Sequence, residues 1–414
     1  MERAGIITIM RETTEYDNQN QPGTPQMLRS MNEHALLEHL WQIGPRSRAQ
    51  LARETGLSKP TVSQALAHLE DAGLVRAIGQ VSSERGGRQA VLYDTDPTAG
   101  YVVGLDVGRR WVRVAAADLA GSIVARSEIL NQAQSAEALV AVVTDLAHTV
   151  VAEAGFTWSH VIHTVIGTPG VYNLDEKRFL FASNLPEWGK SGLIALLHEE
   201  LSSSFTIDND ANLAAVGEHM FGVGTDVENF AFLTVGTGVG LGIIINGSLY
   251  RGAHGSGGEI SFLPLRSPHG AHISGETSAT YRGILEVAAS ADGVVDAALR
   301  LGMSPPLTAE GIFAAARNGD EIAHTVVEYE GEQLALAVAS ISAMLDPSMI
   351  VLGGGIGRNL DLLREPIEQY LREITPFRPR LVASALGNDV ILMGAIATAL
   401  NVARKHVFEQ RAQR

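Results

Sequence analysis

The sequence predicts a winged helix-turn-helix domain at the N-terminus, followed by a larger α/β core with two similar lobes. Three observations lead to this fold class. Residues 30–73 contain three helix-like segments that are separated by tight glycine turns. From residue 101 onward, strand-like and helix-like segments alternate, which is typical of a sheet covered by helices. A glycine-rich hairpin pattern then recurs after residue 230, which indicates a second lobe.

Serine and glycine residues mark the ends of the three N-terminal helices. The expected N-caps are Ser30, Ser47 and Ser58, and Glu33 and Gln50 complete capping boxes with the first two. The expected helix ends are Gly44, Gly56 and Gly73. The third helix carries one apolar stripe, formed by Val62, Ala65, Leu66 and Leu69. Together these signals predict a helix, a tight turn and a second helix.

The exposed face of the third helix has side chains suited to reading DNA bases. Short or amide side chains can pair with base edges in a major groove. The candidates on this helix are Lys59, Thr61, Ser63, Gln64 and His68. Two strands are expected at 74–80 and 89–94, and the hairpin between them carries Arg85 and Arg88, which as a wing would lie along the phosphate backbone or in a minor groove. A plain hairpin tip is the alternative for this wing.

The core alternates strands and helices and then repeats its opening. In the first lobe we expect strands at 102–107, 111–117, 123–129, 161–167 and 205–208, with helices at 136–153, 193–200 and 211–221. In the second lobe, strands at 230–235 and 240–245 repeat the hairpin. Asp106 and Thr234 thereby occupy matching places before a glycine, which suggests two lobes around a cleft.

Composition and charge fit this organisation. The chain has 414 residues, 45% of them hydrophobic and 19% charged, with no cysteine and a net charge of −15. That length predicts two or three domains, and the lack of cysteine excludes disulfides and thiolate zinc sites. Residues 27–94 have a net charge of +1, whereas residues 95–414 have a net charge of −14. The two parts therefore have different tasks.

We expect four segments in a cytoplasmic protein without membrane contact. They are a flexible tail at 1–26, the winged helix-turn-helix at 27–94, the first lobe at 95–221 and the second lobe at 222–414, with a C-terminal helix that returns to the first lobe. The N-terminus lacks the pattern of a signal peptide. The apolar runs are shorter than the roughly 20 residues that a membrane helix needs.

Five motifs together resemble the ROK family of repressors, open reading frames and sugar kinases. They are GLDVG at 104–108, DNDAN at 208–212, TVGTGVGLG at 234–242, GGEI at 257–260 and LGGGIG at 352–357. The resemblance extends over residues 27–400. It implies an actin-like, ribonuclease-H-type core with a sugar site between the lobes, and either sugar phosphorylation or sugar-responsive repression.

The resemblance also assigns site residues. Asp210 follows a strand and precedes a helix, at the position where kinases of this family carry the aspartate that accepts the hydroxyl proton. Asn184, Asn209 and Glu259 match sugar ligands, and a capping or turn role is the alternative for such residues. The vestigial nucleotide site comprises Asp106, Gly108, Gly236, Thr237, Gly238 and Gly354.

Two departures from the family pattern argue against catalysis. Active members follow the first aspartate with a Gly-Gly-Thr type sequence, whereas this chain has Arg109, Arg110 and Trp111. In place of the family's zinc-binding residues it has Phe262 and, at 270–277, a segment without cysteine; the position of a sugar-binding glutamate corresponds to Ser278. We therefore expect no metal, no cofactor and no kinase activity.

These inferences predict a DNA-binding repressor of carbohydrate-related genes whose core senses a sugar, sugar phosphate or other sugar derivative. Helices that read the major groove usually act in pairs, so we expect a homodimer or homotetramer on a pseudo-palindromic operator. One alternative is a DNA-tethered, ATP-dependent sugar kinase. Another is a repressor whose core responds to a partner protein.

Overall fold

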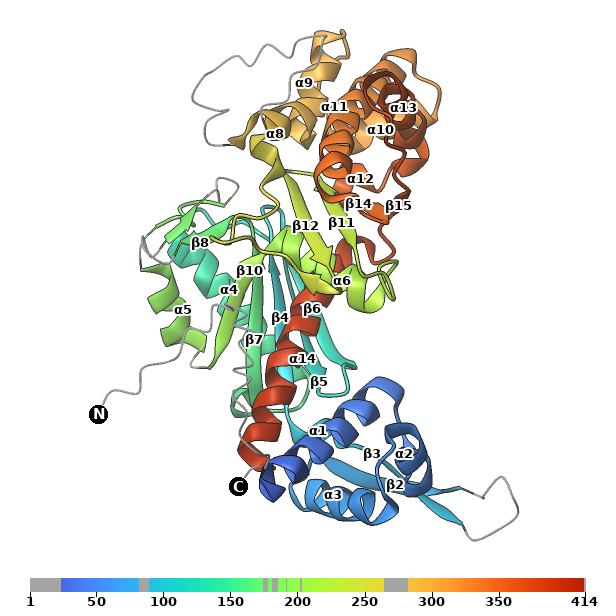
Figure 1. The fold of residues 1–414 in the computed structure, drawn as a ribbon. Helices are drawn as coiled ribbons and strands as arrows, with labels where there is room; N and C mark the ends of the chain where they lie inside the picture. The colour runs from blue at the N-terminus through green and yellow to red at the C-terminus, as the bar shows by residue number, and fades with distance from the viewer. Residues whose placement is uncertain are drawn as a thin grey trace.

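The computed structural model describes residues 24–81, 89–173, 178–180, 185–190, 192–201, 203–263 and 282–412. They form a small N-terminal head and two α/β lobes (Figure 1). The predicted combination of a winged helix-turn-helix with a two-lobed α/β core is confirmed.

The head contains three helices and a three-stranded sheet. The helices are α1 (Pro25–Ile43), α2 (Arg48–Thr55) and α3 (Lys59–Asp71), and the strands, in sheet order, are β1 (Arg46–Ser47), β3 (Ala90–Thr95) and β2 (Val75–Val81). Ser47 and Gln50 form the predicted capping box, and Gly56 takes the left-handed conformation with φ of 73°. Ser58 caps α3, and the predicted apolar stripe of this helix is buried. Local signals therefore determine the tight turn between α2 and α3.

The first helix begins earlier than expected, so the predicted capping box at Ser30 and Glu33 is wrong. Thr24 caps α1 by accepting a hydrogen bond from the Met27 amide at 3.2 Å. Glu33 is buried, with only 1% of its surface exposed, and its Oε1 lies 2.9 Å from Nδ1 of His68 on α3. The spacing of Ser30 and Glu33 resembled a cap, but Glu33 serves a tertiary contact between two helices.

The first lobe is a five-stranded sheet with the order β10-β7-β4-β5-β6. Its strands are β4 (Tyr101–Val107), β5 (Trp111–Asp118), β6 (Ile123–Leu130), β7 (Val161–Thr168) and β10 (Phe205–Asn209). On one face lie α4 (Ala136–Glu153) and α5 (Leu193–Leu201), and on the other face lies the C-terminal helix α14 (Val390–Arg411). Smaller elements are β8 (Val171–Asn173), β9 (Arg178–Leu180) and the 3-10 helices η1 (Pro97–Ala99) and η2 (Trp158–His160).

The second lobe is also a five-stranded sheet, with the order β13-β12-β11-β14-β15. Its strands are β11 (Phe230–Val235), β12 (Val239–Ile245), β13 (Ser248–Leu249), β14 (Met349–Gly353) and β15 (Leu381–Ala383). One face packs on α6 (Asp210–Phe221). The large apolar cluster on the other face includes α8 (Ile284–Ala289), α9 (Ala291–Arg300), α10 (Ala309–Arg317), α11 (Glu321–Leu345) and α13 (Leu360–Ile374). Short turns are η3 (Ile260–Phe262), α12 (Gly354–Gly357) and η4 (Gly387–Asp389).

The two lobes open with the same kind of hairpin. β4 pairs antiparallel with β5, and β11 pairs antiparallel with β12. Asp106 and Thr234 are the penultimate residues of β4 and β11. The two turns that follow these strands therefore face one cleft between the lobes, as the repeated pattern predicts.

Helix α14 packs against β4, β7 and α6, and its far end reaches the head (Figure 1). Among the described residues, the segment 387–411 is the one helix whose length and composition would allow a membrane span, but 56% of that apolar window is buried inside the molecule. Burial against a sheet explains its apolar composition, because a helix covered on several sides needs few polar residues.

The head and the first lobe share one continuous apolar cluster. Leu36, Leu37 and Leu40 of α1 belong to the same cluster as Val407 and Phe408 of α14. The His34 ring meets the Phe408 ring edge-on, with centroids 5.0 Å apart, and the Arg404 guanidinium lies 4.9 Å from the centre of the Trp41 ring. The head is therefore packed onto the core.

Candidate functional site

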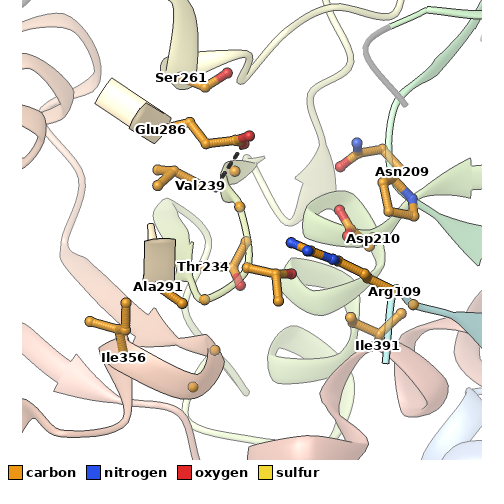
Figure 2. Close-up of a pocket in the computed structure, with 18 of the residues that line it drawn as sticks. Arg109, Asn209, Asp210, Thr234, Val239, Ser261, Glu286, Ala291, Ile356 and Ile391 are labelled. Carbon is orange, nitrogen blue, oxygen red and sulfur yellow. Dashed lines mark hydrogen bonds between the residues drawn. The ribbon is translucent and has the colours of Figure 1, made fainter. Parts of the chain in front are cut away.

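A cavity of about 760 Å³ lies between the two lobes. Predicted site residues that line it are Asp106, Gly108, Asn209, Asp210, Gly236, Thr237, Gly238, Glu259 and Gly354. Figure 2 shows Asn209 and Asp210 on one side of the cavity and Glu286 on the other. Asn184 and Ser278 lie outside the described residues. The fold thus brings together residues that are far apart in the sequence.

Asp210 is the first residue of α6 and points into the cavity (Figure 2). Burial raises the pKa of Asp210 to about 6, and the negative charge of Asp106 adds to this effect. A carboxyl group with a pKa near neutrality can accept a proton or a hydrogen bond from a hydroxyl group. The position and the pKa of Asp210 therefore suit a polyhydroxyl ligand.

Asn209 caps α6, which is the alternative role considered for the predicted sugar ligands. Its Oδ1 accepts hydrogen bonds from the amides of Ala211 at 2.9 Å and Asn212 at 3.3 Å. Its Nδ2 donates to the Gly170 carbonyl at 3.3 Å. These bonds hold the side chain at the cavity wall, so capping and ligand contact are compatible for this residue.

Glu259 and Glu286 add two further carboxyl groups. Burial raises the pKa of Glu259 to about 7, with contributions from the charges of Asp210 and Glu286. Burial also raises the pKa of Glu286, although this carboxylate accepts hydrogen bonds from Arg282 Nε at 3.0 Å and from the Val239 amide at 3.2 Å. Glu286 is not among the site residues predicted from the sequence, because this chain lacks the cysteine cluster that marks this region in the family pattern.

The side of the cavity expected to hold nucleotide is occupied by charged side chains. Asp106 faces Arg113 across the β4–β5 pair, and Arg113 Nη1 donates to Asp106 Oδ2 at 2.8 Å. Burial nevertheless raises the pKa of Asp106 to about 6, against the opposing effect of Arg113. A carboxylate already paired with arginine is a poor ligand for the divalent cation that phosphoryl transfer requires. The residues present therefore do not fit a kinase metal site.

Figure 2 shows the Arg109 side chain extending beside Asp210 toward the turn that starts at Thr234. Arg109 Nη1 lies 3.7 Å from Asp292 Oδ2, which belongs to α9 of the other lobe. Phe262, at the position of the family's zinc-linked histidine, also lines the cavity. Bulky side chains thus line the cavity at two positions where the family pattern has other residues.

The second candidate site is the surface of α3, which lies on the side of the head away from the core (Figure 1). Lys59 and Gln64 are exposed, and Thr61 and Ser63 are half-buried. The Thr61 and Ser58 hydroxyl groups are 2.8 Å apart, so Thr61 also supports the helix cap. His68 is paired with Glu33. Arg85 and Arg88 lie outside the described residues.

Comparison with known proteins assigns the two parts of the chain. A model of the ROK family matches residues 102–402, and a model of the MarR family matches residues 28–89. The first match covers more than half of the chain. This chain belongs to the ROK family.

Relatives of this ROK protein include an enzyme and a regulator. The glucokinase of Halalkalibacterium halodurans is 32% identical over 71% of this chain and 93% of that protein. The xylose repressor of Caldicellulosiruptor bescii is 26% identical over 92% of this chain and 98% of that protein. The crystal structure of a ROK family transcriptional regulator, a homolog of the E. coli MLC protein, shares the fold over 93% of this chain and 99% of that chain, with a TM-score of 0.73 and 22% identity.

The match to the glucokinase is confined to about the length of the core, whereas the matches to the repressor and the regulator include the head. This ROK protein is accordingly a transcriptional regulator with a DNA-binding helix-turn-helix domain and a sugar-kinase-like core.

The buried carboxyl groups of this ROK core predict a stability that falls as pH rises. In the unfolded chain Asp and Glu ionise near pH 4, whereas the pKa is about 6 for Asp106 and Asp210 and about 7 for Glu259. Between these values the folded protein retains protons that the unfolded chain has released, so the stabilisation present below about pH 4 is lost as pH rises through 6 to 7.

Asp210→Asn removes one of these charges. We expect it to stabilise the fold more at about pH 7.5 than at about pH 4.5, by roughly 1 to 2 kcal/mol. Thermal unfolding at both pH values measures this difference, and Asp145→Asn, at an exposed position on α4, is the control. Equal effects of Asp210→Asn at the two pH values would contradict the raised pKa.

Proposed function

We propose that this protein is a repressor of carbohydrate-related genes and that its interlobe cavity binds a sugar or sugar derivative as effector. Asn209, Asp210 and Glu259 would contact the ligand hydroxyls, together with the predicted ligand Asn184. Glu286, the additional carboxylate at the cavity wall, completes a set of hydrogen-bond acceptors suited to a polyol. The names of the repressor relatives support this assignment.

The observation that carries the proposal is the course of α14. Val390 and Ile391, at its start, line the cavity. Phe408, near its end, packs against His34 of α1. A helix of 22 residues spans about 33 Å at 1.5 Å per residue, so one rigid element contacts both the ligand site and the DNA-binding head. An effector that favours one arrangement of the lobes would therefore reorient the head.

We propose that kinase activity is lost. The Asp106–Arg113 ion pair and the placement of Arg109 favour this interpretation. The competing function is a DNA-tethered sugar kinase, which is favoured by the near-neutral pKa of Asp210 and by the relation to a glucokinase. Sugar-dependent ATP consumption that Asp210→Asn abolishes would establish the kinase.

We further propose a cytoplasmic homodimer or homotetramer that places two α3 helices on a pseudo-palindromic operator. Lys59, Thr61, Ser63, Gln64 and His68 would contact the major groove, and Arg85 and Arg88 the adjacent backbone or minor groove. Each head is packed on its core. A change in the relative orientation of the two cores of a dimer would therefore alter the separation of the two recognition helices.

The test is a DNA-binding titration. Fluorescence anisotropy on DNA from the upstream region of its own gene, at fixed salt and without ATP, is followed as a panel of sugars and sugar phosphates is added. We expect one of them to shift the DNA affinity by the 5- to 150-fold typical of allosteric coupling. Glu259→Gln should weaken that response while leaving DNA binding without effector unchanged, because Glu259 lies in the cavity and far from α3.

The matched control is Glu199→Gln, because Glu199 is exposed on α5 and does not line the cavity. DNA binding that no sugar affects would contradict sugar sensing and favour the partner-protein alternative. An equal response in the wild type and Glu259→Gln would remove Glu259 from the ligand site.

A further inference from the structure

Arginine side chains from both lobes line the cavity beside its glycine turns. Arg109 and Arg110 follow β4 in the first lobe, and Arg358 follows α12 in the second lobe. All three residues are exposed and line the cavity. Arg113 and Arg282 also line it, so five arginines line the cavity together with five carboxyl groups, those of Asp106, Asp210, Glu259, Glu286 and Glu310.

These arginines differ in how far their charge is already neutralised. Arg113 is paired with Asp106 and Glu128, and Arg282 is paired with Glu286 and Asp292. Within the part of the chain that the structure describes, Arg109 has one distant carboxylate partner, Asp292 at 3.7 Å, and Arg110 and Arg358 have no ion pair. Three guanidinium groups therefore offer unused donors to the cavity.

The arginines adjoin the carboxyl groups that suit sugar hydroxyls. Arg109 runs alongside Asp210 (Figure 2), and the charges of Asp210 and Glu286 both act on Glu259. The cavity thus has an acidic part that accepts hydrogen bonds and an adjoining part rich in free guanidinium donors. Guanidinium groups bind phosphate oxygens through paired, charge-assisted hydrogen bonds.

We propose that the effector is a phosphorylated sugar, whose phosphate group is bound by Arg109, Arg110 and Arg358. The inference rests on the proposed sugar-sensing function and specifies its ligand class. The phosphate lies beside the glycine turns of the cavity, and its contacts come from both lobes. Binding therefore draws Arg358 toward Arg109 and stabilises a closed cleft. A volume of about 760 Å³ accommodates a monosaccharide phosphate.

Isothermal titration of the full-length protein with matched pairs of ligands tests this inference. Glucose, mannose and N-acetylglucosamine are each compared with their own 6-phosphates, and AMPPNP and inorganic phosphate are titrated separately. We expect at least one sugar phosphate to bind 10-fold or more tightly than its neutral parent. Arg109→Gln and Arg358→Gln should each reduce that advantage by about 10-fold or more, because each removes charged hydrogen bonds.

Arg372→Gln is the matched control, because Arg372 is exposed on α13 and does not line the cavity. Thermal unfolding of each variant verifies the fold, and the shift in DNA affinity caused by the sugar phosphate provides a second readout.

The outcomes separate this inference from the proposed function. If neutral sugars bind and shift DNA affinity, and their phosphates bind no more tightly, the phosphate site is overturned and sugar sensing stands. If AMPPNP or inorganic phosphate binds while no sugar in either form does, both proposals are overturned and the arginines serve a nucleotide or free phosphate. Unchanged sugar phosphate binding in Arg109→Gln and Arg358→Gln also overturns the phosphate site.

Discussion

Arg404→Ala is expected to abolish most of the effector's influence on DNA binding while leaving the affinity without effector close to that of the wild type. Arg404 lies on α14, and its Nε and Nη2 donate to the Leu119 carbonyl at 3.0 and 2.8 Å. Its guanidinium group also stacks on Trp41 of α1. One side chain therefore ties the ligand-lining helix, the first-lobe sheet and the head together, whereas α3 is untouched.

The measurement is the anisotropy titration with and without effector. A wild-type response within the 5- to 150-fold range should fall to about twofold or less in Arg404→Ala. Arg404→Lys retains the positive charge and lacks the planar pair of donors, so an intermediate response is expected. Lys405→Ala, at the next and exposed position, serves as control. A full effector response in Arg404→Ala would show that the signal does not pass through this contact.

Gln64→Ala is expected to reduce the discrimination between bases at one position of the operator. Gln64 is exposed on α3, and a glutamine amide can pair with both hydrogen-bonding groups of an adenine edge. Losing such a pair costs roughly 1 to 3 kcal/mol of discrimination, or about 5- to 150-fold. Affinities for the operator and for operators with single base changes, measured at one salt concentration, reveal this effect.

Two further variants distinguish base reading from backbone contact. Lys59→Ala should weaken binding to all sequences and reduce the salt slope by about 1, because a lysine that meets a phosphate releases counterions. Gln42→Ala, at an exposed position on α1, should have neither effect. Equal losses on the operator and on random DNA for Gln64→Ala would place Gln64 on the phosphate backbone.

In the head, local sequence signals predicted α2 and α3 well and α1 poorly. The box at Ser47 and Gln50, the left-handed Gly56 and the cap at Ser58 depend on neighbouring residues and were predicted correctly. The spacing of Ser30 and Glu33 alone predicts a capping box, but the N-cap of α1 is Thr24. The burial of Glu33 against His68 depends on the packing of α1 on α3. This packing brings together two residues that are 35 positions apart in the chain.

In the core, the sequence identified Asp210 and Glu259 as cavity residues but missed the contacts that define their chemistry. The Asp106–Arg113 pair follows from the register of β4 and β5, and the charge of Asp106 is one cause of the raised pKa of Asp210. Glu286 belongs to a helix from another part of the chain. Such contacts bring charged groups together through the fold, so no local pattern indicates them.

By itself, the sequence determined the order of the elements, because capping residues and apolar periodicity act within a few positions along the chain. It also determined the loss of the Gly-Gly-Thr pattern and of every cysteine, which are facts of composition. Only the tertiary structure decided that α14 connects the cavity to α1, that Arg109 lies beside Asp210, and that burial raises the pKa of the cavity carboxyl groups. These properties depend on burial and on distances between remote residues, which arise only when the whole chain packs.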